Sequence, residues 1–246
     1  MRRKIIGFGQ LLSIAMLSVP SSAYSAENDP TTLDATLKTV RAQYKNAILG
    51  MSLTDWRNIP FPEVPKAGNP LREQTVGICS SFPKWTSSAF PLAISEVEKA
   101  SGVVTCAYYT DYKIAGVFFG SSTTTGRSVL SIGQSRQMDS VDYYFYQDQL
   151  FRIVAAAELD AVGDVIEGLT ARFGASTVTS KGSVQNKAGA TFEKITAEWK
   201  VGPDTIILNA PGGGRVDKLT VTFLNQALAQ QVLSEVEKLN PAASKM

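Results

Sequence analysis

Apolar and polar residues alternate along this chain with two different periods, which outline its secondary structure. Residues 31–49 place apolar side chains at steps of three and four, and this spacing predicts an amphipathic helix. The same spacing predicts helices over residues 160–173, with Asp160 as the N-cap, and over residues 226–239. A shorter helix is expected over residues 91–100.

Beyond residue 102 the pattern changes to the period of two that is typical of strands. Residues 106–119 predict two strands that meet near residues 110–111, and residues 140–157 predict a hairpin that turns at residues 147–149. Residues 192–201 alternate cleanly between apolar and polar side chains, which is typical of an antiparallel sheet with one solvated face.

The order of these elements predicts an α+β fold. We expect an antiparallel sheet, or sheets, of hairpins with the helices packed on one side. Residues 27–246 are long enough to form a single domain with a sizeable core. The pattern also allows two similar lobes that divide near residues 120–128.

The three consecutive glycines from Gly212 to Gly214 raise the question of a phosphate-binding loop. Such a loop opens a helix and carries Lys and then Ser or Thr after its last glycine. Here the segment after Arg215 alternates like a strand. The glycines are therefore expected to form a turn between two antiparallel strands, and an anion-binding nest beside Arg215 is the alternative.

The first 26 residues have the three-part form of a secretory signal peptide. Arg2, Arg3 and Lys4 precede an apolar run, which is followed by Pro20 and a series of small residues. The run is too short to span a bilayer, and no later segment reaches that length. We therefore expect residues 1–26 to be removed, leaving a periplasmic or secreted protein with no transmembrane segment.

Net charge gives no indication of a nucleic-acid partner. The chain has 24 Lys plus Arg and 22 Asp plus Glu, and residues 1–26 hold three of the bases and none of the acids. Residues 27–246 therefore carry a net charge of −1, and they contain no basic cluster of the kind that follows a phosphate backbone. We expect no nucleic-acid binding.

Cys79 and Cys106 are the two cysteines of the chain. An even number of cysteines in an exported protein favours a structural disulfide. Their separation of 27 positions differs from the close spacing of a redox pair. We predict that the two are bonded to each other.

Few combinations of residues suggest catalysis. The chain has no histidine, which excludes histidine bases and histidine-ligated zinc, and two cysteines are too few for a cysteine-rich metal site. Ser81 and Lys84 match the S-x-x-K pattern of one class of acyl enzymes, but the other motifs of that class are absent. Glu158 belongs to an acidic group that fits the start of a helix. We expect no cofactor and no metal site.

Aromatic residues are the best candidates for a binding surface. Strand alternation sends neighbouring side chains to opposite faces, so we expect some tyrosines near the cysteines to leave the core. Exposed Tyr and Trp are common anchors of binding surfaces. The alternative is that these side chains cover a sheet edge or cap a lobe. The candidates are Trp85, Tyr108, Tyr109 and Tyr112.

The segment NAILGMSLTDW, residues 46–56, resembles a segment of small exported modules of the beta-barrel assembly lipoprotein and beta-lactamase inhibitor protein type. In that pattern Gly50 allows a tight turn and Ser52 caps the next helix. The chain lacks the lipid-bearing cysteine of the lipoprotein. The resemblance implies binding without catalysis and assigns no functional residue.

These observations lead us to expect a non-catalytic binding or envelope-assembly module whose partner is another exported or envelope protein. One alternative is a hydrolase that uses carboxylates or a Ser-Lys pair. Another is a carrier that holds a small apolar ligand between the sheet and the helices.

Overall fold

The computed structural model describes residues 40–60, 72–81, 94–115, 121–127, 130–132, 136–185 and 188–240, with the side chains of 72–76 and 110–137 left out. The chain divides into two compact units, Met1–Leu37 and Lys38–Met246, and every described residue belongs to the second. The predicted signal peptide and the beginning of the predicted helix 31–49 lie outside the described residues.

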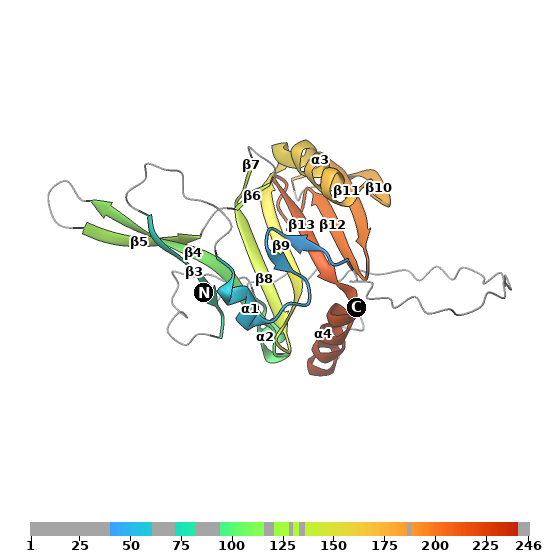
Figure 1. Cartoon of the computed structure of the whole chain (residues 1–246). Coiled ribbons are helices and arrows are strands. Elements are labelled where there is room, and N and C mark those ends of the chain that lie inside the picture. Colours follow the sequence, from blue (N-terminus) through green and yellow to red (C-terminus); the bar gives the residue numbers. More distant parts are fainter. Residues whose placement is uncertain are drawn as a thin grey trace, which may run out of the picture. The chain divides into compact units, whose positions relative to one another are not determined.

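Nine of the described strands form one antiparallel sheet, which confirms the predicted α+β class (Figure 1). Its hydrogen-bonded order is β10-β11-β12-β13-β9-β8-β4-β3, and β5 pairs with β4 beside this path. The strands are β3 (Arg72–Cys79), β4 (Val104–Ala115), β5 (Ser121–Arg127), β8 (Ser140–Tyr146), β9 (Gln149–Glu158), β10 (Val178–Gln185), β11 (Thr191–Val201), β12 (Asp204–Ala210) and β13 (Lys218–Asn225). Two small hairpins pair β1 (Gln43–Tyr44) with β2 (Ala47–Ile48) and β6 (Leu130–Ile132) with β7 (Arg136–Met138).

The helices predicted over residues 91–100, 160–173 and 226–239 are present, and their ends agree in part with the prediction. The described helices are α1 (Leu53–Asn58), α2 (Glu96–Ala100), α3 (Val162–Phe173) and α4 (Gln226–Leu239), with a short 3₁₀ helix, η2 (Leu159–Ala161), before α3. The predicted bounds of α4 are confirmed. The predicted N-cap of α3 is wrong, because Ala161 holds that position and no side chain caps the helix. Helix α2 begins later than expected, at the capping box formed by Ser95 and Glu98.

The two faces of the sheet carry different helices, because successive side chains of a strand point to opposite faces. On β13, Val221 and Phe223 join the larger core, in which α1, the β1-β2 hairpin and α3 also take part. The next residue, Leu224, packs with Leu228 of α4 in a second core on the opposite face. The expected packing of all helices on one side is therefore corrected: α3 and α4 lie on opposite faces.

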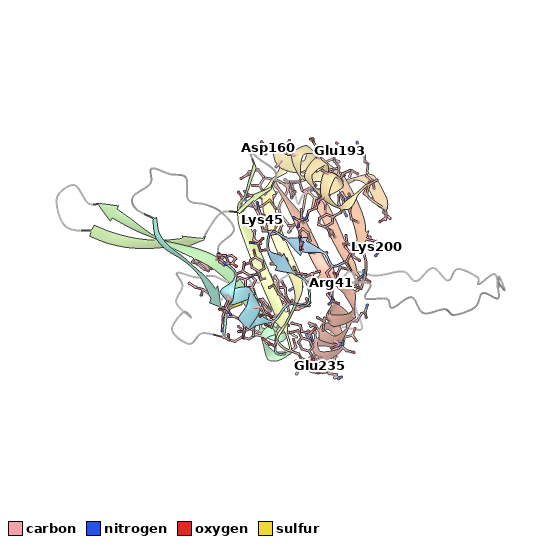
Figure 2. The ribbon with its side chains drawn as sticks, in the orientation of Figure 1. Arg41, Lys45, Asp160, Glu193, Lys200 and Glu235 are labelled. Atoms are coloured by element: carbon pink, nitrogen blue, oxygen red, sulfur yellow. A yellow bond between two sulfur atoms is a disulfide. The ribbon has the colours of Figure 1, made fainter. Side chains whose placement is uncertain are left out.

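The predicted helix over residues 31–49 is wrong in its described part, where the chain forms the β1-β2 hairpin. Lys45 takes a positive φ of 53° in the turn, so Tyr44 points into the core while Ile48 is 41% exposed. A buried carboxylate fixes this hairpin: Asp204 accepts hydrogen bonds from Arg41 Nε at 2.7 Å and from the Ala42 backbone N–H at 2.8 Å. Figure 2 labels Arg41 just before the hairpin. Tertiary contacts therefore override the helical spacing here.

Strand β4 is continuous, so the predicted turn near residues 110–111 is wrong. The strand pairs with β3 on one side, and with β8 and then β5 on the other. Strands β3 and β5 pair with Thr110 and Asp111 and hold them in extended backbone, although the local sequence favours a turn. The hairpin β8-β9, which turns at Gln147 and Asp148, confirms the prediction for residues 140–157.

Candidate functional site

Two of the four aromatic residues proposed as a binding surface are buried. Tyr108 and Tyr109 are adjacent in β4, and 6% and 2% of their surfaces are exposed. The expectation that one of them leaves the core is wrong, because both faces of β4 are covered at this point. Trp85 and the side chain of Tyr112 lie outside the described residues, and a binding role of the four stays a prediction.

Tyr108 belongs to an aromatic cluster that is centred on Trp56 of α1. The Trp56 ring centroid lies 4.8 Å from that of Tyr108, 5.0 Å from that of Tyr143 and 5.7 Å from that of Phe145. Burial raises the pKa of Tyr108 to about 12 and the pKa of Tyr143 well above its ordinary value of 10. Both phenols are therefore neutral at physiological pH, and the cluster serves packing.

The predicted disulfide between Cys79 and Cys106 is confirmed. The two residues face each other in the register of β3 and β4, and both are buried. The bond therefore joins the strand at the sheet edge to the long strand β4 beside the Trp56 cluster. Its position indicates a structural role.

Within the described part of the chain, the candidate catalytic residues do not come together in one site. Ser81 is exposed at the end of β3, and Lys84 lies outside the described residues. Glu158 forms an ion pair with Lys218, which also donates a hydrogen bond of 2.6 Å to Asp139. These two carboxylates raise the pKa of Lys218, so its amine is protonated and cannot act as a nucleophile at neutral pH.

The glycine-rich segment forms the predicted turn between two antiparallel strands. Strand β12 ends at Ala210 and β13 begins at Lys218. Gly213 and Gly214 take positive φ values of 62° and 74°, a conformation that glycine adopts readily. Arg215 donates two hydrogen bonds to Asp217, so its guanidinium already has an anionic partner. The geometry is that of a turn and gives the anion-binding alternative no support.

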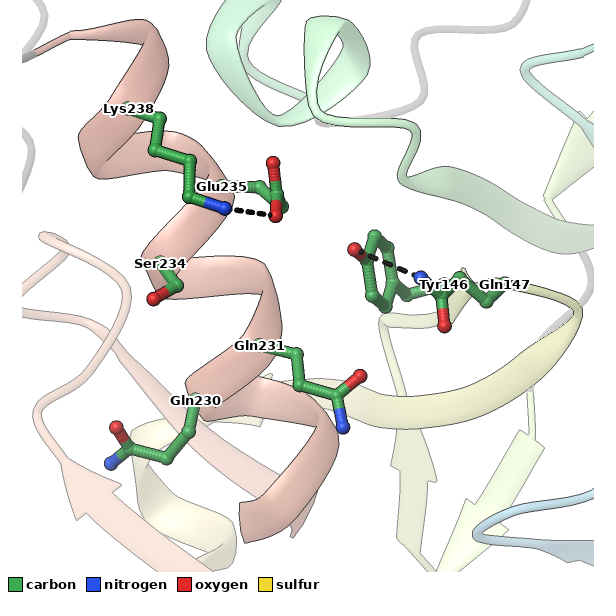
Figure 3. A pocket seen from close by; sticks show the side chains of 7 residues that line it. All are labelled: Tyr146, Gln147, Gln230, Gln231, Ser234, Glu235 and Lys238. Carbon is green, nitrogen blue, oxygen red and sulfur yellow. Dashed lines mark hydrogen bonds and ion pairs between the residues drawn. The ribbon is translucent and has the colours of Figure 1, made fainter.

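An open hollow of about 470 Å³ lies between α4 and the β8-β9 turn (Figure 3). Its lining is mostly polar, and four of the lining residues interact with one another in pairs. Gln147 donates a hydrogen bond to Tyr146, and Lys238 forms an ion pair with Glu235 at 2.7 Å. The other lining residues are Gln230, Gln231 and Ser234 of α4. Polar lining of this kind does not match the apolar ligand that a carrier function requires.

On the face of the sheet that carries α4, the described helices and loops leave an area uncovered beyond this helix, and we call this area the open face. Strand register places one row of side chains across β11, β12, β13, β9 and β8, and a second row beside it. The first row is Glu198, Ile207, Thr222, Val154 and Asp142, and the second is Thr196, Asn209, Thr220, Ala156 and Ser140. Nine of these ten residues are half-buried, and Asp142 is buried.

Charged contacts border the open face where it meets α2. Arg152 lies two residues before Val154 on the same face of β9 and stacks over the ring of Tyr144, with its guanidinium carbon 3.9 Å from the ring centroid. The same side chain pairs with Glu98 of α2 at 2.7 Å. Partial burial raises the pKa of Glu98, but Arg152 and Ser95 outweigh it, and the net pKa is lowered.

The open face is a surface that the sequence pattern did not reveal, because its side chains are short and mostly uncharged. Alternation in residues 192–201 predicted a solvated face for β11, which the exposed Lys194 and Lys200 confirm. It gave no sign that the same face continues over four further strands. That continuity depends on the order of the strands, which hairpin patterns alone do not specify.

No protein-family model, curated protein or solved structure matches the chain. Within the described part of the chain, no helix is both long and apolar enough to cross a bilayer. The same residues contain no group of three or more acidic or cysteine side chains placed to hold a metal ion.

Proposed function

We propose that this chain is a non-catalytic binding module of the periplasm or of the secreted fraction, and that it captures another exported or envelope protein on its open face. The observation that carries the proposal is the pair of rows across five neighbouring strands, in which every residue except the buried Asp142 is half-buried. One face of the sheet is closed by α3, α1 and the β1-β2 hairpin, whereas this face is covered by α4 and α2 at one end.

The chemistry of the open face fits a protein partner. Its centre combines Ile207 and Val154 with Thr222 between them, while Glu198 and the Lys218 cluster lie at its rim. An apolar centre inside a polar rim is the common anatomy of protein interfaces. A rigid antiparallel sheet presents such side chains with little conformational freedom left to lose on binding.

The expected export of the chain supports the same proposal independently of the surface. The Cys79–Cys106 disulfide is typical of oxidising compartments. It agrees with the signal peptide predicted for residues 1–26 and with the resemblance of residues 46–56 to a segment of exported binding modules. In residues 46–56 the structure has the two local features of that pattern, a positive φ at Gly50 and Ser52 as the N-cap of α1.

Site-specific crosslinking tests the proposal. A photoreactive phenylalanine analogue replaces Thr222 on the open face in one variant and Ala171, which is exposed on α3, in the other. We expect a discrete crosslinked protein from position 222 alone. The captured protein is then identified, purified and titrated against wild type, Thr222→Arg and Ala171→Arg, with folding checked by circular dichroism.

Binding should be lost with Thr222→Arg and kept with Ala171→Arg, because a long charged side chain at the centre prevents close contact. Equal crosslinking from both positions, or binding by a folded Thr222→Arg variant, would contradict the proposal. Substrate turnover that a Ser81→Ala change abolishes in a folded protein would favour a hydrolase instead.

A further inference from the structure

Among the strands that the structure describes, β10 is the last at its end of the sheet, and it pairs with β11 alone (Figure 1). All eight residues, Val178–Gln185, are exposed, so neither face of the strand is covered. Val178 and Val184 are 52% and 36% exposed. One row of backbone N–H and C=O groups along this strand therefore faces away from β11.

Edge strands usually carry features that prevent pairing with another chain, such as prolines, bulges or several charges. Strand β10 contains no proline, and its register with β11 runs without a shift over eight pairs. Lys181 is its one charged residue, and Glu193 of β11 lies 3.5 Å from the ammonium group. The edge is long, straight and nearly neutral.

We propose that β10 pairs in antiparallel fashion with β10 of a second copy of this chain, around a two-fold axis at Gly182. The pairing joins two sheets into one continuous sheet across the dimer. It uses the edge of the sheet and does not depend on the function proposed for the open face.

The register follows from the strand's own sequence. A two-fold axis perpendicular to the sheet keeps the equivalent side chains of both copies on the same face of the joined sheet. Directly opposed residues of an antiparallel pair also point to the same face, so the residue at the axis must pair with its own copy. An axis at Lys181 places two ammonium groups directly opposite each other, which is unfavourable. An axis at Ser183 leaves fewer residues of β10 paired.

An axis at Gly182 avoids both problems. It pairs residues 179–185 of the two strands, and Lys181 of each copy then faces Ser183 of the other. A Cβ built on Gly182 has nothing within 4 Å, so the backbone is open to close approach. A single pair of strands buries less area than a permanent dimer requires, so the dimer should be weak and concentration-dependent.

Sedimentation equilibrium of the disulfide-bonded chain, from micromolar to millimolar concentrations, measures the association. We expect the mean mass to rise from the monomer towards the dimer. Opposite charges across the axis then test the register in a Glu193→Gln background, because Glu193 lies directly opposite residue 183 within each chain. In that background Ser183→Glu faces Lys181 of the other copy twice in each dimer. This variant should bind about two- to tenfold more tightly, and Ser183→Lys should bind more weakly by a similar factor. Thr191→Lys, exposed on β11, is the matched control and should leave the association unchanged.

Engineered cysteines provide a second measurement. Directly opposed residues of an antiparallel pair have Cα atoms about 4.5 to 5.5 Å apart, a distance that a disulfide can bridge. Gly182→Cys should therefore form a covalent dimer on mild oxidation, and Lys181→Cys should form much less. A chain that stays monomeric throughout, or equal crosslinking from the two positions, would overturn the proposal. A dimer insensitive to both Ser183 changes would overturn the β10 assignment.

Discussion

Trp56 occupies the space that a side chain at position 77 would need. A Cβ on Gly77 would lie 2.7 Å from Cζ3 of the Trp56 ring, a separation that is too short for any real contact. The glycine lies in β3, two residues before the disulfide-bonded Cys79. The ring therefore packs directly on the backbone of the edge strand and ties α1 to the sheet.

We predict that Gly77→Ala lowers the free energy of unfolding by about 1 to 3 kcal/mol, because the core around Trp56 has no room for the methyl group. Urea unfolding followed by tryptophan fluorescence measures the change. Gly163→Ala is the control, because a Cβ there meets nothing within 4 Å and alanine favours a helix. A Gly77→Ala variant as stable as wild type would show that the helix moves away easily.

Loss of the Cys79–Cys106 bond should lower the free energy of unfolding by roughly 3 to 4 kcal/mol, as the chain-entropy model gives for a loop of this length. The double change of both cysteines to alanine is compared with reduced wild type by urea unfolding. The two should agree, since each lacks the same crosslink. Alkylation of thiols in the native oxidised protein would argue against the bond.

Asp204→Ala should release the N-terminal hairpin. The fully buried carboxylate accepts hydrogen bonds from Arg41 and from the Ala42 N–H, so its removal leaves both donors without this partner. We expect a loss of roughly 2 to 4 kcal/mol in the free energy of unfolding and faster amide exchange over residues 42–49. Asp217→Ala breaks an exposed pair and should change little. Unchanged exchange in the hairpin of Asp204→Ala would show that other contacts suffice to hold it.

The Glu98–Arg152 pair should make stability dependent on acid pH. The pKa of Glu98 is lowered below 4.5 in the folded protein, which therefore binds this proton less tightly than the unfolded chain does. The pair's contribution is fully present above pH 4.5 and is lost as the pH falls through the folded pKa. The difference in unfolding free energy between wild type and Glu98→Gln should therefore shrink over that range. Glu96→Gln, exposed on the same helix, is the control, and a difference independent of pH would contradict the assignment.

Elements whose hydrophobic pattern agrees with their tertiary setting could be predicted from the sequence. Strand β11 alternates as its buried Ala197 and Trp199 require, and α4 ends where its periodic pattern ends. The glycine turn was predictable because the residues after Arg215 alternate. In each case the local preference and the surrounding sheet favour the same conformation.

The errors arose where distant partners decide the conformation. The spacing of Tyr44 and Ile48 fits a helix, but the carboxylate of Asp204 lies far along the chain and fixes a hairpin instead. Tyr108 and Tyr109 are neighbours in a strand and so point to opposite faces of the sheet, which led us to expect one of them to be exposed. Both are buried. The open face was not predicted, because its rows exist only once the order of the strands is known.

The contact between Arg41 and Asp204 spans 163 positions, and this span sets an order of events during folding. Residue 41 leaves the ribosome long before the carboxylate that fixes it has been made. The hairpin, with Tyr44 and Leu49 bound for the core, therefore has no site to occupy until β12 has formed. Contacts of such separation also slow folding, because the loop must close before the contact is gained. This hairpin, the first segment of the chain that the structure describes, is thus among the last to dock, and until then its apolar side chains are available to chaperones and proteases.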